Sequence, residues 1–193
     1  MAVFNKQNLL SELLDRTDLI NSSTRVFFRL SDEQLNNRQA PGKWSIAEIF
    51  EHLNITHQIY INFILAKITK AADVNSLSYK SGWIGDWVYE RIMPKSDGSV
   101  FKMKAPKTLQ PAYGALDPKE VLNRFLQQQD TLHDIIRHSS TKDIQGIKIP
   151  FAFTKTLKLR LGDNLRFLIA HNERHLLQAQ RIMEAVDEKT TLQ

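Results

Sequence analysis

The sequence predicts an all-α protein folded as a four-helix bundle, and three observations support this fold class. Apolar residues recur at the spacing of amphipathic helices over four long stretches of the chain. Two of these stretches begin at strong helix-capping sequences. The alternation typical of strands is confined to one short region. Helices of this kind bury their apolar sides against one another, so we expect a single domain spanning residues 1–193.

The first half of the chain contains two of the predicted helices. The first covers about residues 5–30, where leucine, isoleucine and phenylalanine recur at helical spacing. The second begins at Ser45, because Ser45 and Glu48 form a capping box, and it ends near Ala72. Its apolar stripe consists of Ile46, Ile49, Phe50, Leu53, His57, Tyr60, Ile64 and Ile68.

A long connection separates the second predicted helix from the third. Within it, residues 82–92 are predicted to form a short amphipathic helix that carries Trp83, Trp87 and Val88 on one side. Residues 94–118 contain Pro94, Pro106, Pro111 and Pro118, which leave little room for a regular element. Loops longer than about 12 to 15 residues often form lids or pocket walls. We therefore expect this segment to be an ordered pocket wall, and the whole connection leaves room for a crossover.

The second half of the chain contains the other two predicted helices. Asp117 is an N-cap residue before Pro118, so the third helix starts there and fades near Ser139. Apolar residues alternate between Ile147 and Leu161, which allows a short hairpin that includes Phe153. The fourth helix is predicted over residues 163–187.

Composition excludes several classes of site. The chain has no cysteine, so disulfides, thiolate metal sites and cysteine nucleophiles are excluded, and a metal site would have to use His, Asp, Glu or water. No apolar run approaches the roughly 20 residues that span a bilayer, and the N-terminus lacks the pattern of a signal peptide. We therefore expect a cytoplasmic protein without a membrane partner.

The net charge of +5 is modest, with 26 basic and 21 acidic residues. The basic residues are dispersed, apart from a cluster at Lys95, Lys102, Lys104 and Lys107. A charge of this size is typical of solubility rather than nucleic-acid recognition, so no nucleic-acid partner is expected. The lysine cluster could instead attract an anionic substrate or a thiol cofactor.

Three histidines carry the functional prediction. His171 and His175 are four residues apart on the fourth predicted helix, a spacing at which two imidazoles can reach one metal ion. His52 lies on the second helix, and all three fall on the flank of an apolar stripe, which suits the rim of a pocket. Spacing alone leaves open whether they form a metal site or are three partly exposed histidines without a common purpose.

Two segments resemble signatures of the DinB-like superfamily. Trp44-Ser45-Ile46-Ala47-Glu48 followed by His52-Leu53 resembles its W-S-x-x-E-x-x-x-H-L motif, and His171, His175 and Gln178 resemble its closing H-x-x-x-H-x-x-Q helix. The resemblance covers nearly the whole chain. It implies a four-helix bundle in which His52, His171 and His175 hold a divalent metal ion, which is nickel, zinc, iron or manganese in different members.

The same resemblance implies an activity. Several members transfer or isomerise with a low-molecular-weight thiol, so we expect a metal-dependent enzyme, specifically a thiol-dependent S-transferase with a small-molecule substrate. A bound metal would act as a Lewis acid that lowers the pKa of a thiol or water. A metal-dependent hydrolase and a catalytically silent metal- or ligand-binding bundle are the alternatives. Dimerisation is common in the family, and the amphipathic helices permit a homodimer.

The remaining histidines and a carboxylate have simpler interpretations. His57 lies on the apolar stripe and is expected to be a hydrogen-bonded core residue, whereas His133 and His138 are expected at the surface. Glu48 could join the metal, but its place in the capping box already explains it. Asn172 occupies the position of the general base in H-E-x-x-H metalloproteases, so that class is excluded.

Two further interpretations stay open. Asn172 falls on the central stripe of its helix, where it could orient a neighbouring histidine or be a satisfied buried amide. Trp83, Trp87 and Tyr89 could line a substrate pocket, although packing of a loop onto the bundle explains them as well. Trp44, directly before the capping box, is expected to be a hydrophobic staple or a core anchor.

Overall fold

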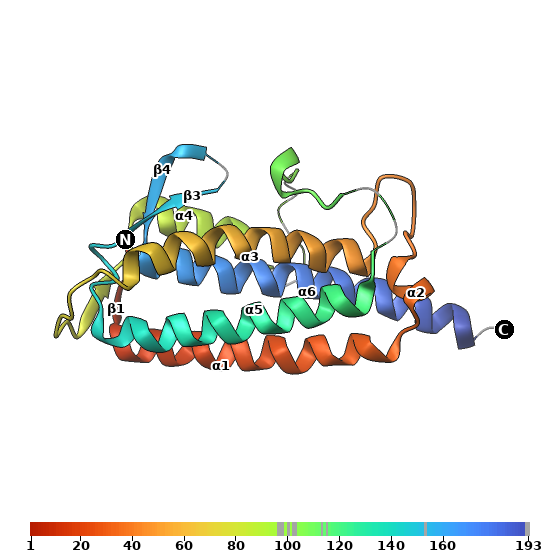
Figure 1. Ribbon diagram of the computed structural model, residues 1–193, viewed down its shortest axis with the longest axis horizontal. Coiled ribbons are helices and arrows are strands. Elements are labelled where there is room, and N and C mark those ends of the chain that lie inside the picture. Colours follow the sequence, from red (N-terminus) through yellow and green to blue (C-terminus); the bar gives the residue numbers. More distant parts are fainter. Residues whose placement is uncertain are drawn as a thin grey trace.

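A computed structural model describes residues 1–95, 99, 101, 104–112, 114, 116–152 and 154–191 of the chain. Four long helices lie side by side along the molecule: α1 (Lys6–Arg25), α3 (Ile46–Ile68), α5 (Pro118–His138) and α6 (Leu161–Thr191) (Figure 1). Helix α3 packs against α5 and α6, and α1 packs against the same two helices. The predicted four-helix bundle is confirmed.

The capping sequences start the helices where the sequence predicts. Before α3, the Ser45 hydroxyl accepts from the Glu48 backbone N–H at 3.2 Å, and the Ser45 N–H donates to the Glu48 carboxylate at 2.9 Å. Before α5, Asp117 accepts from the backbone N–H of Glu120 at 3.0 Å. Helix α3 ends at Ile68, earlier than the predicted Ala72, because the chain turns at Thr69.

Small elements join the long helices. Helix α1 continues into the 3-10 turn η1 (Val26–Arg29), and α2 (Asp32–Asn36) leads toward α3. Strands β3 (Lys148–Phe151) and β4 (Thr154–Arg160) form the predicted antiparallel hairpin before α6. Phe153, which the hairpin prediction included, lies outside the described residues.

The long connection contains more regular structure than predicted. Strand β2 (Ser78–Lys80) pairs antiparallel with β1 (Val3–Asn5), a contact between residues far apart in the sequence. It is followed by the predicted short helix, α4 (Trp83–Ile92), which packs against α6, and the 3-10 turn η2 (Lys107–Leu109) lies further along. Trp83 and Trp87 are 69% and 52% exposed, so the inward side of α4 is formed by Gly85, Val88 and Ile92 instead.

A buried polar network holds α4 close to α6. A methyl group at Gly85 would lie 2.2 Å from the Asp163 side chain, so only glycine allows the two helices to approach this closely. Asp163 accepts a hydrogen bond from the Tyr79 hydroxyl, and Asp86 accepts one from Arg166 at 2.7 Å. Helix α4 carries Ile92, which lines a pocket beside α6, so this network fixes one wall of that pocket.

Aromatic side chains from several helices fill the centre of the bundle. Phe50 packs edge-on against Phe27 from η1 and against Phe125 from α5, with ring centroids 5.4 and 5.0 Å apart. All three side chains are at most 1% exposed. Full burial of each contributes about 1.5–3 kcal/mol. Among the residues that the structure describes, no helix combines the length and apolar character needed to cross a membrane.

Candidate metal centre

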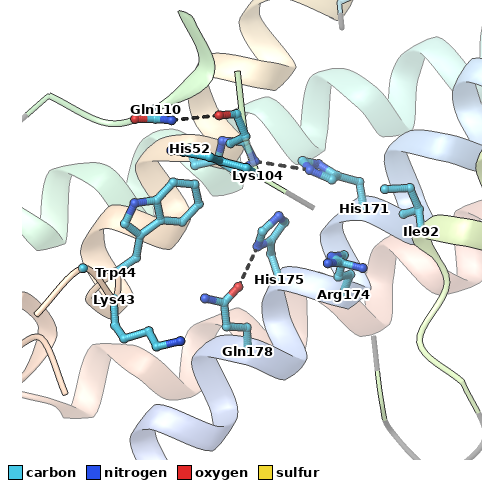
Figure 2. Close-up of a pocket in the computed structure, with 12 residues that line it drawn as sticks. Lys43, Trp44, His52, Ile92, Lys104, Gln110, His171, Arg174, His175 and Gln178 are labelled. Carbon is cyan, nitrogen blue, oxygen red and sulfur yellow. Dashed lines mark hydrogen bonds between the residues drawn. The ribbon is translucent and has the colours of Figure 1, made fainter. Parts of the chain in front are cut away.

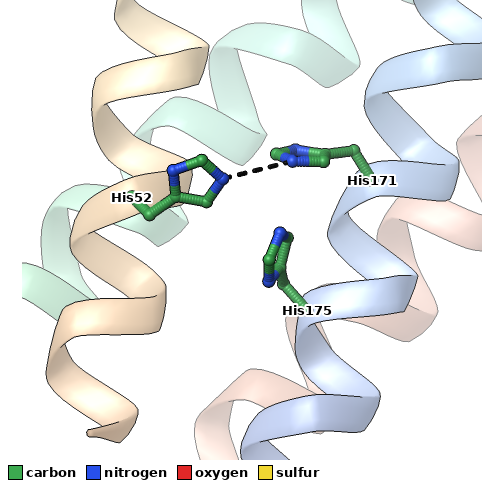
Figure 3. Close-up of side chains that lie close together, drawn as sticks. All are labelled: His52, His171 and His175. Carbon is green, nitrogen blue, oxygen red and sulfur yellow. Dashed lines mark hydrogen bonds between the residues drawn. The ribbon is translucent and has the colours of Figure 1, made fainter. Parts of the chain in front are cut away.

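His52, His171 and His175 converge between α3 and α6 (Figure 3). Their ring centroids lie 4.6 to 5.2 Å apart, and one potential ligand nitrogen from each lies within 4.8 Å of the other two. Helix α6 presents His171 and His175 one turn apart, and α3 brings His52 opposite them. Over the described ranges, these three form the only such cluster of His, Asp or Glu side chains.

The three imidazoles are more buried than a rim position predicts. His52 and His171 are each 2% exposed and His175 is 8% exposed. The Trp44 ring covers His52, with centroids 5.0 Å apart, and the segment around Leu109 closes over it from the long connection. The helical pattern could not predict these two covers, because both come from outside the helices.

Burial also sets the protonation state of the cluster. It lowers the pKa of His52, lowers that of His171 well below its usual value, and together with the neighbouring His52 and Arg174 lowers that of His175 to about 3. All three imidazoles are therefore neutral near pH 7. Neutral imidazole is the form that binds metal ions.

Hydrogen bonds at the outer ring nitrogens fix which nitrogen faces inward. His52 Nδ1 lies 2.6 Å from the Leu109 carbonyl oxygen, which can only accept, so Nδ1 carries the proton and Nε2 keeps its lone pair. His175 Nδ1 lies 3.0 Å from Gln178 Oε1, which assigns the same tautomer. This is the arrangement by which proteins orient metal-binding histidines.

The geometry of the cluster fits a divalent metal ion. His52 Nε2 and His171 Nε2 lie 3.3 Å apart. Two nitrogens bound to one tetrahedral ion at about 2.0–2.1 Å would lie about 3.3–3.4 Å apart. The buried His171 Nδ1 has no hydrogen-bond partner in the part of the chain that the structure describes, so no described residue makes a polar contact with the ring through that atom. The three histidines could therefore hold one metal ion.

A pocket of about 460 Å³ opens onto the cluster (Figure 2). Trp44 and Lys43 form one wall, Ile92 and Arg174 contribute to another, and Gln110 belongs to the connection that covers His52. That connection is tied to itself, because Gln110 donates to the Ala105 carbonyl at 2.8 Å. The prediction that the long connection forms a pocket wall is confirmed for Lys104, Ala105 and Gln110.

His57 belongs to the core and not to the histidine cluster. His57 is 1% exposed, and its Nε2 donates to Asn172 Oδ1 at 2.7 Å. Asn172 in turn donates to Gln129 at 3.3 Å, so it is the satisfied buried amide and does not contact the cluster. His133 is partly exposed and His138 is exposed, as predicted.

Of the other residues named in the sequence analysis, some line the pocket and others do not. Glu48 is engaged by its cap and by an ion pair with Arg38, so it does not join the histidines. Trp44 is half-buried and lines the pocket, which extends its predicted role as an anchor. Trp83 and Trp87 point outward and do not line it. The hydroxyl of Tyr89 contacts Arg16.

The lysine cluster contributes one residue to the pocket. Lys104 lines it, whereas Lys95 and Lys107 are exposed and Lys102 lies outside the described residues. Sequence reasoning missed other contributors, among them the Leu109 carbonyl, Arg174 and the side chain of Gln178 as a partner of His175. For Gln178, its place in the H-x-x-x-H-x-x-Q motif and its i, i+3 spacing from His175 were available signals.

Comparison with known proteins gives consistent results. The family model of the DinB superfamily matches residues 18–179. The uncharacterised protein YuaE of Bacillus subtilis is 23% identical over 158 residues, which cover 82% of this chain and 88% of that protein. The structure of YfiT from Bacillus subtilis, described as a probable metal-dependent hydrolase with an unusual four-helix bundle topology, aligns with a TM-score of 0.55 at 15% identity. The alignment covers 94% of this chain and 87% of YfiT.

Proposed function

This chain belongs to the DinB superfamily, and from that membership and its buried histidine cluster we propose that it is a divalent-metal-dependent enzyme acting on a small molecule. The proposed reaction is thiol-dependent S-transfer, in which the sulfur of a low-molecular-weight thiol forms a bond to an electrophilic small molecule. His52, His171 and His175 would hold the metal ion. The proposal is supported most directly by three neutral imidazoles that face one another at the bottom of a pocket.

Each histidine has a defined task in this proposal. His52 and His175 offer Nε2 lone pairs because Leu109 and Gln178 hold their Nδ1 protons. His171 lies stacked on Phe167, with ring centroids 5.4 Å apart, which limits rotation of its ring. A divalent cation bound there supplies Lewis acidity, which lowers the pKa of a thiol or water beside it.

The lining of the pocket favours a thiol over water as the nucleophile. None of its described lining residues is Asp or Glu, so no carboxylate stands ready to take a proton from water. A thiol has an ordinary pKa of about 8.5 and needs much less assistance to ionise. The cationic residues Lys43, Lys104 and Arg174 would further stabilise a thiolate.

Hydrolysis is the second candidate. The same three histidines could support it, and the likeness in fold to YfiT, itself described as a probable metal-dependent hydrolase, is the observation in its favour.

Two measurements test these assignments. Protein purified without a nickel column should contain about one divalent metal ion per chain. The metal-loaded protein is then assayed with thiols plus electrophiles, and separately with esters and amides. Thiol consumption that disappears in His52→Ala but persists in His138→Ala, a variant of an exposed histidine, supports the transferase. Turnover of esters or amides alone would establish the hydrolase. Bound metal without either reaction would contradict both and indicate a binding bundle.

A further inference from the structure

A second cavity adjoins the histidine pocket. It has a volume of about 420 Å³ and shares Lys43, Trp44, Arg174 and Gln178 with the first. From there it continues along α6 to Ile182. A molecule reacting at the histidines therefore has room to extend past Trp44 along α6.

The walls of the two cavities are positively charged. Lys43 and Arg174 line both of them, Lys104 lines the first, and Arg181 lines the second. No Asp or Glu occurs among the described residues that line either cavity. Cavity walls of one sign concentrate ligands of the opposite sign.

Arg174 is the most informative of these cations. It is half-buried, and its Nη2 donates to the Phe101 carbonyl, whereas its buried Nη1 has no hydrogen-bond partner among the described residues. Within the described part of the chain, no carboxylate forms an ion pair with it. By contrast, a carboxylate pairs with each of Arg16, Arg38, Arg124 and Arg166.

An unpaired, partly buried guanidinium is costly, and a bound anion would offset that cost. Figure 2 shows Lys43 and Arg174 on different sides of His175, so a ligand between them would lie beside the histidine cluster. Trp44, Leu177 and Ile182 provide apolar surface in the adjoining cavity.

We propose that the small molecule that reacts at the histidine cluster carries a carboxylate or phosphate group, which Arg174 binds and the positive charge of Lys43 attracts, and an apolar part, which packs against Trp44. This assignment rests on the proposed function for its reaction, but the anion site itself consists of residues other than the three histidines. Arg174 is thus a substrate-binding residue.

The experiment compares matched probes by isothermal titration calorimetry on the full chain. Phenylacetate and phenyl phosphate are the anions, and 2-phenylethanol is the neutral probe of similar shape. The protein is treated with EDTA and dialysed first, so that the probes cannot bind through a metal ion. Each titration is made at low and at high salt.

At least one anion should bind about tenfold or more tightly than 2-phenylethanol, and the preference should fall with salt. Whichever of phenylacetate and phenyl phosphate binds identifies the group. Arg174→Gln should abolish the preference, Arg174→Lys should retain part of it, and Arg137→Gln, at an exposed position in the last turn of α5, should leave it intact. The partial rescue by lysine would separate a charge effect from a folding defect.

Equal binding of the anions and the neutral probe would overturn the proposal, as would an unchanged preference in Arg174→Gln. A Co²⁺ titration of the same proteins keeps the two proposals apart. If Co²⁺ does not bind the wild type, the proposed function fails, whereas the anion preference is decided by the probes alone. If Co²⁺ binds but no anion preference exists, only the anion site is refuted.

Discussion

Asp86 ties α4 to α6, and its replacement by asparagine should lower the free energy of unfolding at neutral pH by about 2 kcal/mol. The carboxylate accepts hydrogen bonds from Arg166 at 2.7 Å and from Ser81 at 2.6 Å. Burial opposes its ionisation, but these hydrogen bonds outweigh burial and lower its pKa from 3.8 to about 2. Each pKa unit corresponds to about 1.4 kcal/mol, and the side chain is only 15% exposed, so solvent screening is limited.

The sign of the pH dependence follows from the lowered pKa. Because the folded protein holds the ionised form more strongly than the unfolded chain does, the contribution is fully present above about pH 4. It is lost as the pH falls through about 2, where the carboxyl group of the folded protein takes up its proton. Wild type and Asp86→Asn should therefore differ at pH 7 and converge toward pH 2.

Urea unfolding followed by circular dichroism at pH 7, 5, 3 and 2 measures this difference. Asp15→Asn, at an exposed position on α1, is the matched control and should follow the wild type at every pH. A destabilisation of Asp86→Asn that is the same at pH 7 and pH 2 would refute the electrostatic reasoning and assign the loss to packing.

Gly85→Ala should lower the unfolding free energy by about 1–3 kcal/mol, because the added methyl group would lie 2.2 Å from the Asp163 side chain; a variant with wild-type urea resistance would show that α4 can shift freely. Asn172→Leu should lower the unfolding free energy by about 1–3 kcal/mol, because His57 Nε2 loses its acceptor inside the core. Thermal unfolding measures this loss, and an unchanged melting temperature would contradict the buried hydrogen bond. Removal of metal with EDTA should lower the melting temperature of the wild type but not that of His175→Ala, because a ligand stabilises only the state that binds it. An equal fall in melting temperature in both proteins would place the metal elsewhere.

Local sequence signals predicted the helix starts, and the family resemblance predicted the histidine cluster. The capping box at Ser45 and the cap at Asp117 fixed two helix starts, because both depend on hydrogen bonds within a few residues. The motifs around His52 and His171 predicted that three histidines meet. Spacing alone cannot predict that α3 packs against α6, whereas the family resemblance implies it.

Contacts between distant segments could not be predicted from local pattern. Strand β1 is too short to show alternation, and α1, α2 and α3 separate it in the sequence from its partner strand, residues 78–80. The Leu109 carbonyl is a backbone atom in an irregular segment, so no residue type marked it as the partner of His52. The outward position of Trp83 depends on how α4 docks on α6, which Gly85 and Asp163 decide. The homodimer and the cytoplasmic location stay predictions from the sequence.

The identity of the metal ligands is the central claim, and Co²⁺ titration followed by visible absorption tests it most directly. The wild type should bind one Co²⁺ per chain, with absorption bands typical of nitrogen ligands. Each of the variants His52→Ala, His171→Ala and His175→Ala should lose these bands, whereas His138→Ala should keep them. A wild type that binds no Co²⁺, or the same spectrum in all the variants, would contradict the three-histidine centre.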